Sequence, residues 1–258
     1  MEPDSELRFR TDSLLGLRDE IHSCRACPRL VAWREAVAVD RRAAFRDEIY
    51  WGRPVSGFGD PLASIAVVGL APAAHGANRT GRMFTGDRSG DWLFASMFRC
   101  GLANQPTSRS SDDGLELKGV WVTAAVRCAP PDNRPEPSER DSCSTFLRRE
   151  LALVGPVRVV VALGAFAYQA VAGLVGVPRP RPPFGHGVEA TTASGITLIC
   201  SYHPSQQNTF TGRLTESMLD SVLARSLEIS KAGARQDATP SSPYGADFDS
   251  GVSVSPAG

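Results

Sequence analysis

Four short apolar runs recur along the chain, and each is followed by a loop and then by a segment with the pattern of a helix. The runs cover residues 64–68, 120–126, 157–163 and 196–201, and most are rich in valine and isoleucine. Apolar runs of this length and composition are typical of buried strands. Because strand, loop and helix alternate four times, the sequence predicts an α/β fold: a three-layer α/β/α arrangement with a central four-stranded, mostly parallel sheet.

The length and composition suit one globular domain. The chain has 258 residues, of which 42% are hydrophobic, which is enough to bury a sizeable core. We expect a single domain over residues 1–231 and a disordered tail over 232–258, where Gly, Ala, Ser and Pro leave little to bury. No run approaches the ~18 apolar residues that span a bilayer, and the acidic start lacks a secretory signal. We therefore expect a cytoplasmic monomer that does not contact membranes.

The loop after the first apolar run, GLAPAAHGANRTGRMFTGD over residues 69–87, has the composition of a ligand site. Ligands of open α/β folds bind at the carboxyl edge of the sheet, where this loop begins. Small residues such as Gly69, Ala71 and Ala73 allow a flat or phosphate-bearing ligand to approach the main chain closely. The sequence therefore predicts a binding site formed by this loop.

A second polar loop, HPSQQNTFTGR over residues 203–213, follows the fourth run and is expected at the same edge. An imidazole such as that of His203 can donate a hydrogen bond to charge that develops on a leaving group. The polar residues beside it can bind phosphate through hydroxyl and main-chain N–H groups. His75 fits either a ligand-binding or a structural role, whereas His22 and His186 are assigned structural roles.

Four cysteines lie outside the apolar runs and could share one metal centre. Cys24 and Cys27 form a C-x2-C turn, Cys128 ends the second run, and Cys143 lies on the following helix. Four thiolates suit a [4Fe-4S] cluster, and they also suit a structural zinc ion. The long proline-rich loop between the second pair favours the cluster, and zinc stays the alternative. The other two cysteines have apolar neighbours and are interpreted as small buried hydrophobes: Cys100 and Cys200.

Together, the two loops and four cysteines resemble the uracil-DNA glycosylase superfamily, and family 5 (the UDGb-type enzymes with a [4Fe-4S] cluster) most closely. The resemblance implies a DNA repair enzyme that flips out and excises uracil from double- and single-stranded DNA. It implies that Phe84 stacks on the extruded base, that His203 stabilises the leaving base, and that the four cysteines hold the cluster. An iron–sulfur α/β oxidoreductase and a non-catalytic DNA-binding module are the alternatives.

Two departures from better-known members bear on the substrate. Leu70, Ala71 and Ala73 supply no acidic residue after the first glycine, and Ala124 occupies the place where other members carry an Asn that recognises uracil. A site without that hydrogen-bonding group discriminates less between bases. The resemblance therefore implies a broader range that includes uracil, hypoxanthine and ethenocytosine.

The remaining assignments follow from the two loops. Asp87 is the nearest carboxylate for activating water, although it could instead begin a helix, and Asn78 is a candidate water-positioning amide. Asn208 is assigned to the bound nucleotide. Gln206 and Gln207 stand where some relatives carry an apolar wedge, and we expect them to probe the orphaned partner base. The residues assigned to DNA contact are Arg79, Ser205, Gln206, Gln207 and Arg213.

Overall fold

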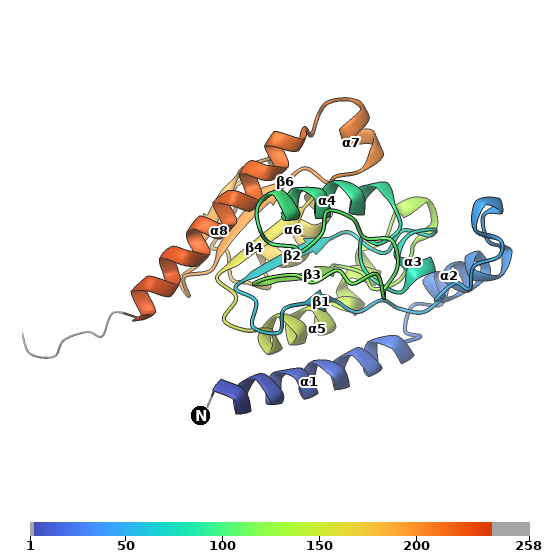
Figure 1. The fold of residues 1–258 in the computed structure, drawn as a ribbon, viewed down its shortest axis with the longest axis horizontal. Coiled ribbons are helices and arrows are strands. Elements are labelled where there is room, and N and C mark those ends of the chain that lie inside the picture. The colour runs from blue at the N-terminus through green and yellow to red at the C-terminus, as the bar shows by residue number, and fades with distance from the viewer. Residues whose placement is uncertain (1–2, 239–258) are drawn as a thin grey trace, which may run out of the picture.

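A mixed six-stranded sheet forms the centre of the molecule (Figure 1), in the strand order β1-β3-β2-β4-β6-β5. The computed structural model describes residues 3–238, with the side chains of residues 13–233. The four central strands are parallel and match the four apolar runs: β2 (Ile65–Gly69), β3 (Val120–Ala124), β4 (Val159–Leu163) and β6 (Thr197–Ser201). The predicted α/β class and mostly parallel sheet are confirmed.

The predicted strand number was too low, because two short antiparallel strands extend the sheet at its edges. These are β1 (Phe58–Gly59), which pairs with β3, and β5 (Glu189–Thr191), which pairs with β6. One has two residues and the other three. Segments this short carry no apolar run, so their pairing is imposed by neighbouring strands rather than by a local pattern.

Helices cover both faces of the sheet, as the three-layer prediction required. One face packs against α4 (Arg88–Arg99) and α8 (Glu216–Ala238), and the other against α5 (Pro137–Leu153) and α6 (Ala165–Ala172). The N-terminal helix α1 (Pro3–Ser23) lies outside this frame and packs against α5. Strands buried on both faces are apolar throughout, which is why the four runs do not alternate with polar residues.

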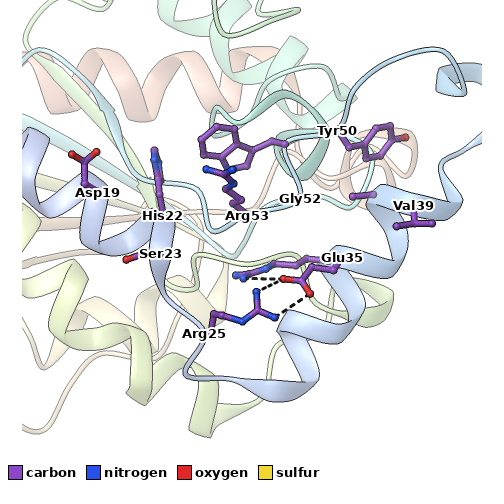
Figure 2. Close-up of a pocket in the computed structure, with 12 residues that line it drawn as sticks. Asp19, His22, Ser23, Arg25, Glu35, Val39, Tyr50, Gly52 and Arg53 are labelled. Carbon is purple, nitrogen blue, oxygen red and sulfur yellow. Dashed lines mark hydrogen bonds and ion pairs between the residues drawn. The ribbon is translucent and has the colours of Figure 1, made fainter.

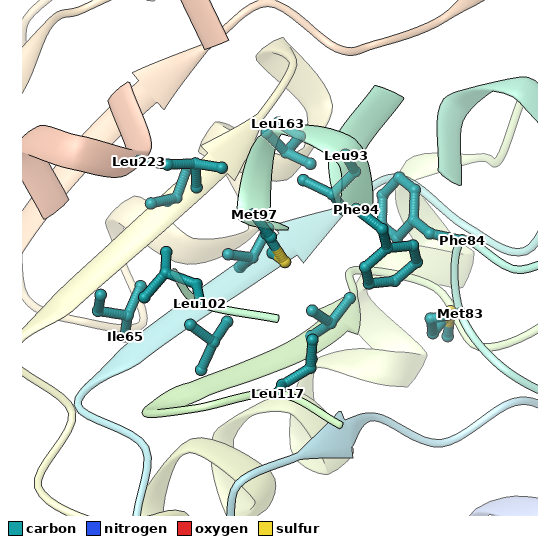
Figure 3. Packing of buried hydrophobic residues seen from close by; sticks show 14 of the residues in the cluster. Ile65, Met83, Phe84, Leu93, Phe94, Met97, Leu102, Leu117, Leu163 and Leu223 are labelled. Atoms are coloured by element: carbon teal, nitrogen blue, oxygen red, sulfur yellow. The ribbon is translucent and has the colours of Figure 1, made fainter. Parts of the chain in front are cut away.

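The face covered by α4 and α8 carries the core nearest to the two predicted loops (Figure 3). Leu93, Phe94 and Met97 of α4 are buried against alternate residues of the parallel strands, such as Ile65. Phe84 joins this same cluster from the loop after β2. The loop is therefore anchored to the core by its aromatic residue.

Shorter helical segments complete the described chain: α2 (Pro28–Asp40), the turn η1 (Ala43–Phe45), α3 (Ala77–Thr80), the turn η2 (Pro131–Asn133) and α7 (Gln206–Phe210). Helix α8 continues to Ala238, so the predicted boundary at residue 231 was wrong, and residues 232–238 are helical. The rest of the predicted tail, 239–258, lies outside the described residues. None of the described helices has the length and apolar character needed to cross a membrane.

Candidate active site

Phe84 and His203, which the sequence places in two different loops, face each other at the carboxyl edge of the sheet. Their ring centroids are 5.9 Å apart and the ring planes differ by 29°. Phe84 is buried and has a positive φ of 54°, a conformation that a bulky residue adopts only when its surroundings require it. Gly90 of α4 makes room for this conformation, because a Cβ there would lie 1.7 Å from the Phe84 carbonyl oxygen.

Gly69 and Ala124 lie beside this pair at the ends of neighbouring strands. They are partners in the parallel register of β2 and β3. A Cβ on Gly69 would stand 2.5 Å from Cζ of Phe84, so only glycine lets the ring rest against the strand end. The Ala124 side chain is buried in the same cluster as Phe84. The place next to the aromatic ring therefore presents a methyl group and no side-chain hydrogen-bonding group.

His203 is half-buried, and its burial lowers the pKa of the imidazole to about 4. The ring is therefore neutral at pH 7 and keeps one N–H for donation. Its main chain is held in place, because Asn208 Nδ2 donates to the His203 carbonyl oxygen at 2.8 Å. His186 fixes the preceding residue by accepting the N–H of Tyr202 at Nδ1, at 3.2 Å. Asn208 thus supports the loop, a role that the sequence did not indicate.

The turn after β2 leaves main-chain donors available near the aromatic pair. The Ala73 carbonyl accepts the N–H groups of Gly76 and Asn78, which closes the turn into α3. Within residues 3–238, neither the Ala71 N–H nor the Ala73 N–H donates to another protein group. Two donors at the carboxyl edge of a sheet can bind a carbonyl or a developing negative charge.

Asp87 begins helix α4, as one of its two predicted interpretations required. Its Oδ1 accepts the N–H of Gly90 at 3.0 Å, which is an N-cap contact. Its Oδ2 faces the first loop, since a Cβ on Gly76 would lie 2.1 Å from that oxygen. Burial raises the pKa of the Asp87 carboxyl, against lowering by hydrogen bonds from the N–H groups of Gly90 and Ser89. The carboxylate thus combines a structural position with a raised basicity.

Asn78 is fully buried in α3, the short helix within the first loop. Its Nδ2 donates to the main-chain carbonyl of Arg34 at 3.2 Å, and its Oδ1 is buried without a hydrogen-bond partner among the described residues. Its own carbonyl accepts the N–H of Gly52. The side-chain amide therefore connects the first loop to α2, and the main-chain carbonyl connects it to Gly52. Only the side-chain Oδ1 is left to hold a water.

Arg79 does not have the geometry predicted for a DNA-contacting residue. Its guanidinium is buried, pairs with Glu48, and donates to the carbonyl oxygens of His75 (2.8 Å) and Gly86 (3.1 Å). It also lies over the ring of Phe45, 4.1 Å from the centroid. Because all three guanidinium nitrogens donate within the protein, Arg79 fixes the first loop instead of facing a phosphate.

The other predicted DNA contacts lie on or beside α7, which projects from the sheet edge (Figure 1). Ser205 caps this helix by accepting the N–H of Asn208 at 3.4 Å. Gln206, Gln207 and Arg213 are exposed. The Arg213 guanidinium lies over the Tyr202 ring, 4.6 Å from its centroid. The structure therefore leaves these three side chains open to a ligand at the His203 loop.

The four predicted ligand cysteines come together below the same edge. Cys27, Cys128 and Cys143 pack in one apolar cluster with Leu30, and the Cys24 thiol is close enough to raise the pKa values of the other three. Burial raises the pKa of the Cys128 thiol to about 12. Among the described residues, no three His, Cys, Asp or Glu side chains converge closely enough to hold a single metal ion. The remaining two cysteines lie elsewhere, as predicted.

Arg34 is a buried residue that the sequence did not single out. Its Nη1 donates to Cys128 Sγ at 2.9 Å and to the Cys24 carbonyl at 3.3 Å, while its Nε has no partner among the described residues. An N–H group aimed at a ligand sulfur is a feature of iron–sulfur sites, where such bonds tune the cluster. The only signal in the sequence was an arginine in the helix that directly follows the C-x2-C turn.

A cavity of about 690 Å³ lies between α1, α2 and the segment around Trp51 (Figure 2). An ion pair between Arg25 and Glu35 lies along one wall. His22 packs edge-on against Trp51, with ring centroids 4.8 Å apart, in keeping with its structural assignment. His75 contacts Tyr50, which lines the cavity: its Nδ1 and the Tyr50 hydroxyl are 3.0 Å apart. Phe84 and His203 do not line this cavity.

Comparison with known proteins gives the family. A model of the uracil DNA glycosylase superfamily matches residues 56–225, which include both loops. The chain belongs to this superfamily. It is 56% identical over 212 residues to the type-5 uracil-DNA glycosylase of Mycobacterium leprae (81% of this chain, 93% of that protein). It is 54% identical over 221 residues to that of Mycobacterium tuberculosis (84% and 82%), and 53% identical over 201 residues to that of Thermus thermophilus (78% and 91%).

Many open α/β enzymes bind phosphate with a glycine-rich loop. In this chain Gly69 and Gly90 instead make room for Phe84. The matched region begins after Cys24 and Cys27, so the first cysteine pair lies outside it, whereas Cys128 lies inside.

Proposed function

We propose that this protein excises uracil from DNA by hydrolysing the N-glycosidic bond. The observation that carries the proposal is the stacked pair of Phe84 and His203 beside Gly69, at the edge where parallel strands end. A base inside a duplex is inaccessible at its glycosidic carbon, so the nucleotide must be extruded, which costs a few kcal/mol. The type-5 names of relatives at 53–56% identity support the same reaction.

The described residues account for stabilisation of the departing base. When the bond between C1′ and the base nitrogen breaks, its electron pair leaves with the base. The main-chain N–H groups of Ala71 and Ala73, together with the neutral imidazole of His203, donate to that developing negative charge. A pKa of about 4 for His203 means that the histidine acts as a neutral donor. The base therefore departs as a stabilised anion.

Water completes the reaction by adding its oxygen to C1′. Its proton passes to the Asp87 carboxylate, whose Oδ2 faces the first loop. A raised pKa brings a carboxylate closer to the basicity needed for proton abstraction at neutral pH. Asn78 serves the water through Oδ1, since its Nδ2 is already bonded to Arg34.

The proposed substrate range is broader than uracil. The methyl side chain of Ala124, beside Gly69, cannot hydrogen-bond the Watson–Crick edge of uracil. A base with a different edge therefore loses no hydrogen bond at this position and is not rejected there. We include hypoxanthine and ethenocytosine on this ground. The DNA strand itself is held by Ser205, Gln206, Gln207 and Arg213, in double- or single-stranded substrates.

The cysteine site fits a [4Fe-4S] cluster held by Cys24, Cys27, Cys128 and Cys143. Cys27, Cys128 and Cys143 share apolar neighbours, Cys24 is half-buried close to them, and Arg34 donates to the Cys128 sulfur. Four thiolates also suit a structural zinc ion. The long proline-rich loop between Cys128 and Cys143 favours the larger cluster. When bound, the cluster supplies a cross-link between α2, α5 and the loop after β3.

The decisive assay is incubation of the protein with a duplex that carries one uracil, followed by alkali. Strand breakage at the uracil is the expected result, and His203→Gln should lose most of it. Binding without breakage would instead indicate a non-catalytic module. Parallel duplexes with hypoxanthine or ethenocytosine test the range, and cleavage of uracil alone would restrict the proposal to that base.

Iron and sulfide analysis with an absorption spectrum tests the cofactor. We expect about four irons per chain and broad absorbance at about 400 nm, both lost in Cys143→Ala. Cys100→Ala is the matched control, because the Cys100 thiol lies against the Asp220 carbonyl and outside the cysteine cluster. Zinc without sulfide would contradict the cluster.

A further inference from the structure

Phe210 is a large apolar side chain that the proposed chemistry leaves unused. It is the last residue of α7, seven positions after His203, and 67% of its surface is exposed. A single exposed phenylalanine is ordinary on a protein surface, so the inference depends on its position in the loop that carries His203 and on its partner.

Its partner is Arg88, the first residue of α4. The Arg88 guanidinium lies over the Phe210 ring, 4.2 Å from its centroid. Arg88 is itself exposed, and among the described residues no carboxylate pairs with it. Arg88 follows Phe84 by four positions, so the pair joins the loop that carries Phe84 to the loop that carries His203. The contact therefore lies at the rim of the predicted base pocket.

We propose that Phe210 and Arg88 form a stacking platform for one nucleobase of the DNA strand next to the extruded nucleotide. The inference rests on the proposed function, and it adds a residue that holds the strand. Arg88 covers one face of the ring, and 67% of the residue stays exposed, which leaves room for stacking of a single base. Insertion between two base pairs would require both faces of the ring. Arg88 keeps its charge free for the adjoining phosphate.

The platform predicts how the affinity for single- and double-stranded DNA depends on Phe210. Aromatic stacking on a base tolerates any sequence, because every base has a flat face, and removal of one aromatic residue costs about 5- to 150-fold in affinity. A single strand exposes its base faces, and a duplex exposes the base face next to an extruded nucleotide, so both substrates offer a base to the platform. A ring that instead filled the gap in a duplex would matter only for duplex substrates. The two roles therefore separate by substrate.

The experiment measures binding and excision for Phe210→Ala. Dissociation constants are measured by fluorescence anisotropy with single- and double-stranded oligonucleotides that carry a stable abasic-site analogue, so the readout does not depend on excision. We expect binding to weaken about 5- to 150-fold on both, with KM raised and the single-turnover rate at saturation unchanged. Phe210→Trp should bind as tightly as the wild type, and Phe210→Leu should bind as weakly as Phe210→Ala.

Phe98→Ala is the matched control, because Phe98 is an exposed phenylalanine of α4 that lies about 15 Å further along the helix axis from Arg88. It should bind as the wild type does. Arg88→Ala should lower the slope of log Kd against log salt by about one unit or somewhat less, because it removes one phosphate contact, whereas Phe210→Ala should leave the slope unchanged.

Two outcomes overturn the platform. Loss restricted to duplex substrates and restored by leucine would assign Phe210 to insertion, and unchanged binding in Phe210→Ala would remove it from the DNA interface. In both, excision by the wild type remains, so the platform can fail while the proposed function stands. A wild type that binds these oligonucleotides but leaves a duplex with one uracil intact would refute the proposed function alone.

Discussion

Substitution of Gly69 by alanine tests whether Phe84 rests where the structure places it. The added Cβ would lie 2.5 Å from Cζ and 2.7 Å from Cε2 of Phe84, whereas carbon atoms in contact stand about 3.5–4.0 Å apart. The ring must therefore move by roughly 1 Å or more. It cannot retreat freely, because Phe84 is buried beside Leu93 and Phe94 and its carbonyl lies against Gly90.

The magnitude follows from the cost of overpacking. Extra carbon in a packed core destabilises by about 1–3 kcal/mol, and each kcal/mol lowers Tm by about 2–4 °C in a domain of this size. Gly69→Ala should therefore lower Tm by about 2–12 °C. A displacement of about 1 Å at the reacting centre costs about a hundredfold in rate, so excision of uracil should fall by about that factor while the fold is retained.

Differential scanning calorimetry and single-turnover excision measure the two effects. Gly16→Ala is the control, because a Cβ on Gly16 in helix α1 meets nothing within 4 Å, and alanine should stabilise that helix by about 0.5–1 kcal/mol. In a Phe84→Ala background the added methyl at Gly69 should cost little stability. A Gly69→Ala variant with wild-type Tm and rate, or an equal cost in both backgrounds, would refute the packing argument.

The remaining predictions concern single side chains. Asp87→Asn keeps an N-cap, so Tm should stay within a few degrees while the excision rate falls at least tenfold; a rate near that of the wild type would end its assignment as base. Burial lowers the His203 pKa from 6.5 to about 4, so its imidazole stays neutral down to about pH 5. The ratio of wild-type to His203→Gln rates should therefore be constant from pH 5 to 8. The free energy of unfolding should fall as the pH drops from about 6.5 toward 4, because over that range the unfolded chain binds a proton at His203 and the folded protein does not. Ala124→Asn should reduce hypoxanthine excision relative to uracil at least tenfold in competition assays. Arg79→Ala should lower Tm, since it leaves the His75 and Gly86 carbonyl oxygens without their donor. Arg213→Ala should weaken DNA binding and reduce its salt dependence with Tm unchanged.

Local patterns in the sequence were enough to place the strands and the loop pair. Each central strand is a contiguous apolar run, and parallel strands bring their carboxyl ends to one edge, so His203 and Phe84 were expected to meet. The edge strands were missed, because two or three residues without an apolar pattern pair only when a neighbour is in place. The end of α8 was missed for a related reason: Gly233 and its small neighbours signal a helix end only weakly.

Side-chain roles were harder to predict than positions, because one residue type serves opposite purposes in different surroundings. Arg79 and Arg213 were assigned the same DNA-binding role, yet Glu48 and two carbonyl groups bury the first, while the second stays exposed. Asn208 lies among polar neighbours in the sequence, and its bond to the His203 carbonyl appears only in three dimensions. The partners that decide these roles are distant in the chain or depend on the loop conformation.

Arg34 connects the cysteine site to the first loop, although no fully buried carboxylate pairs with it among the described residues. Its Nη1 donates to Cys128 Sγ and the Cys24 carbonyl, its Nη2 pairs with the partly exposed Glu35 at 3.6 Å, and its main-chain carbonyl accepts the Asn78 amide. Removing the sulfur leaves a buried N–H group of a charged side chain without its acceptor, which costs about 1–3 kcal/mol or more. Any change that removes the thiolates at the cysteine site is therefore felt at Asn78, in the loop that closes over the base. The cysteine site and the base pocket form one packed unit, although no cysteine has to touch the substrate.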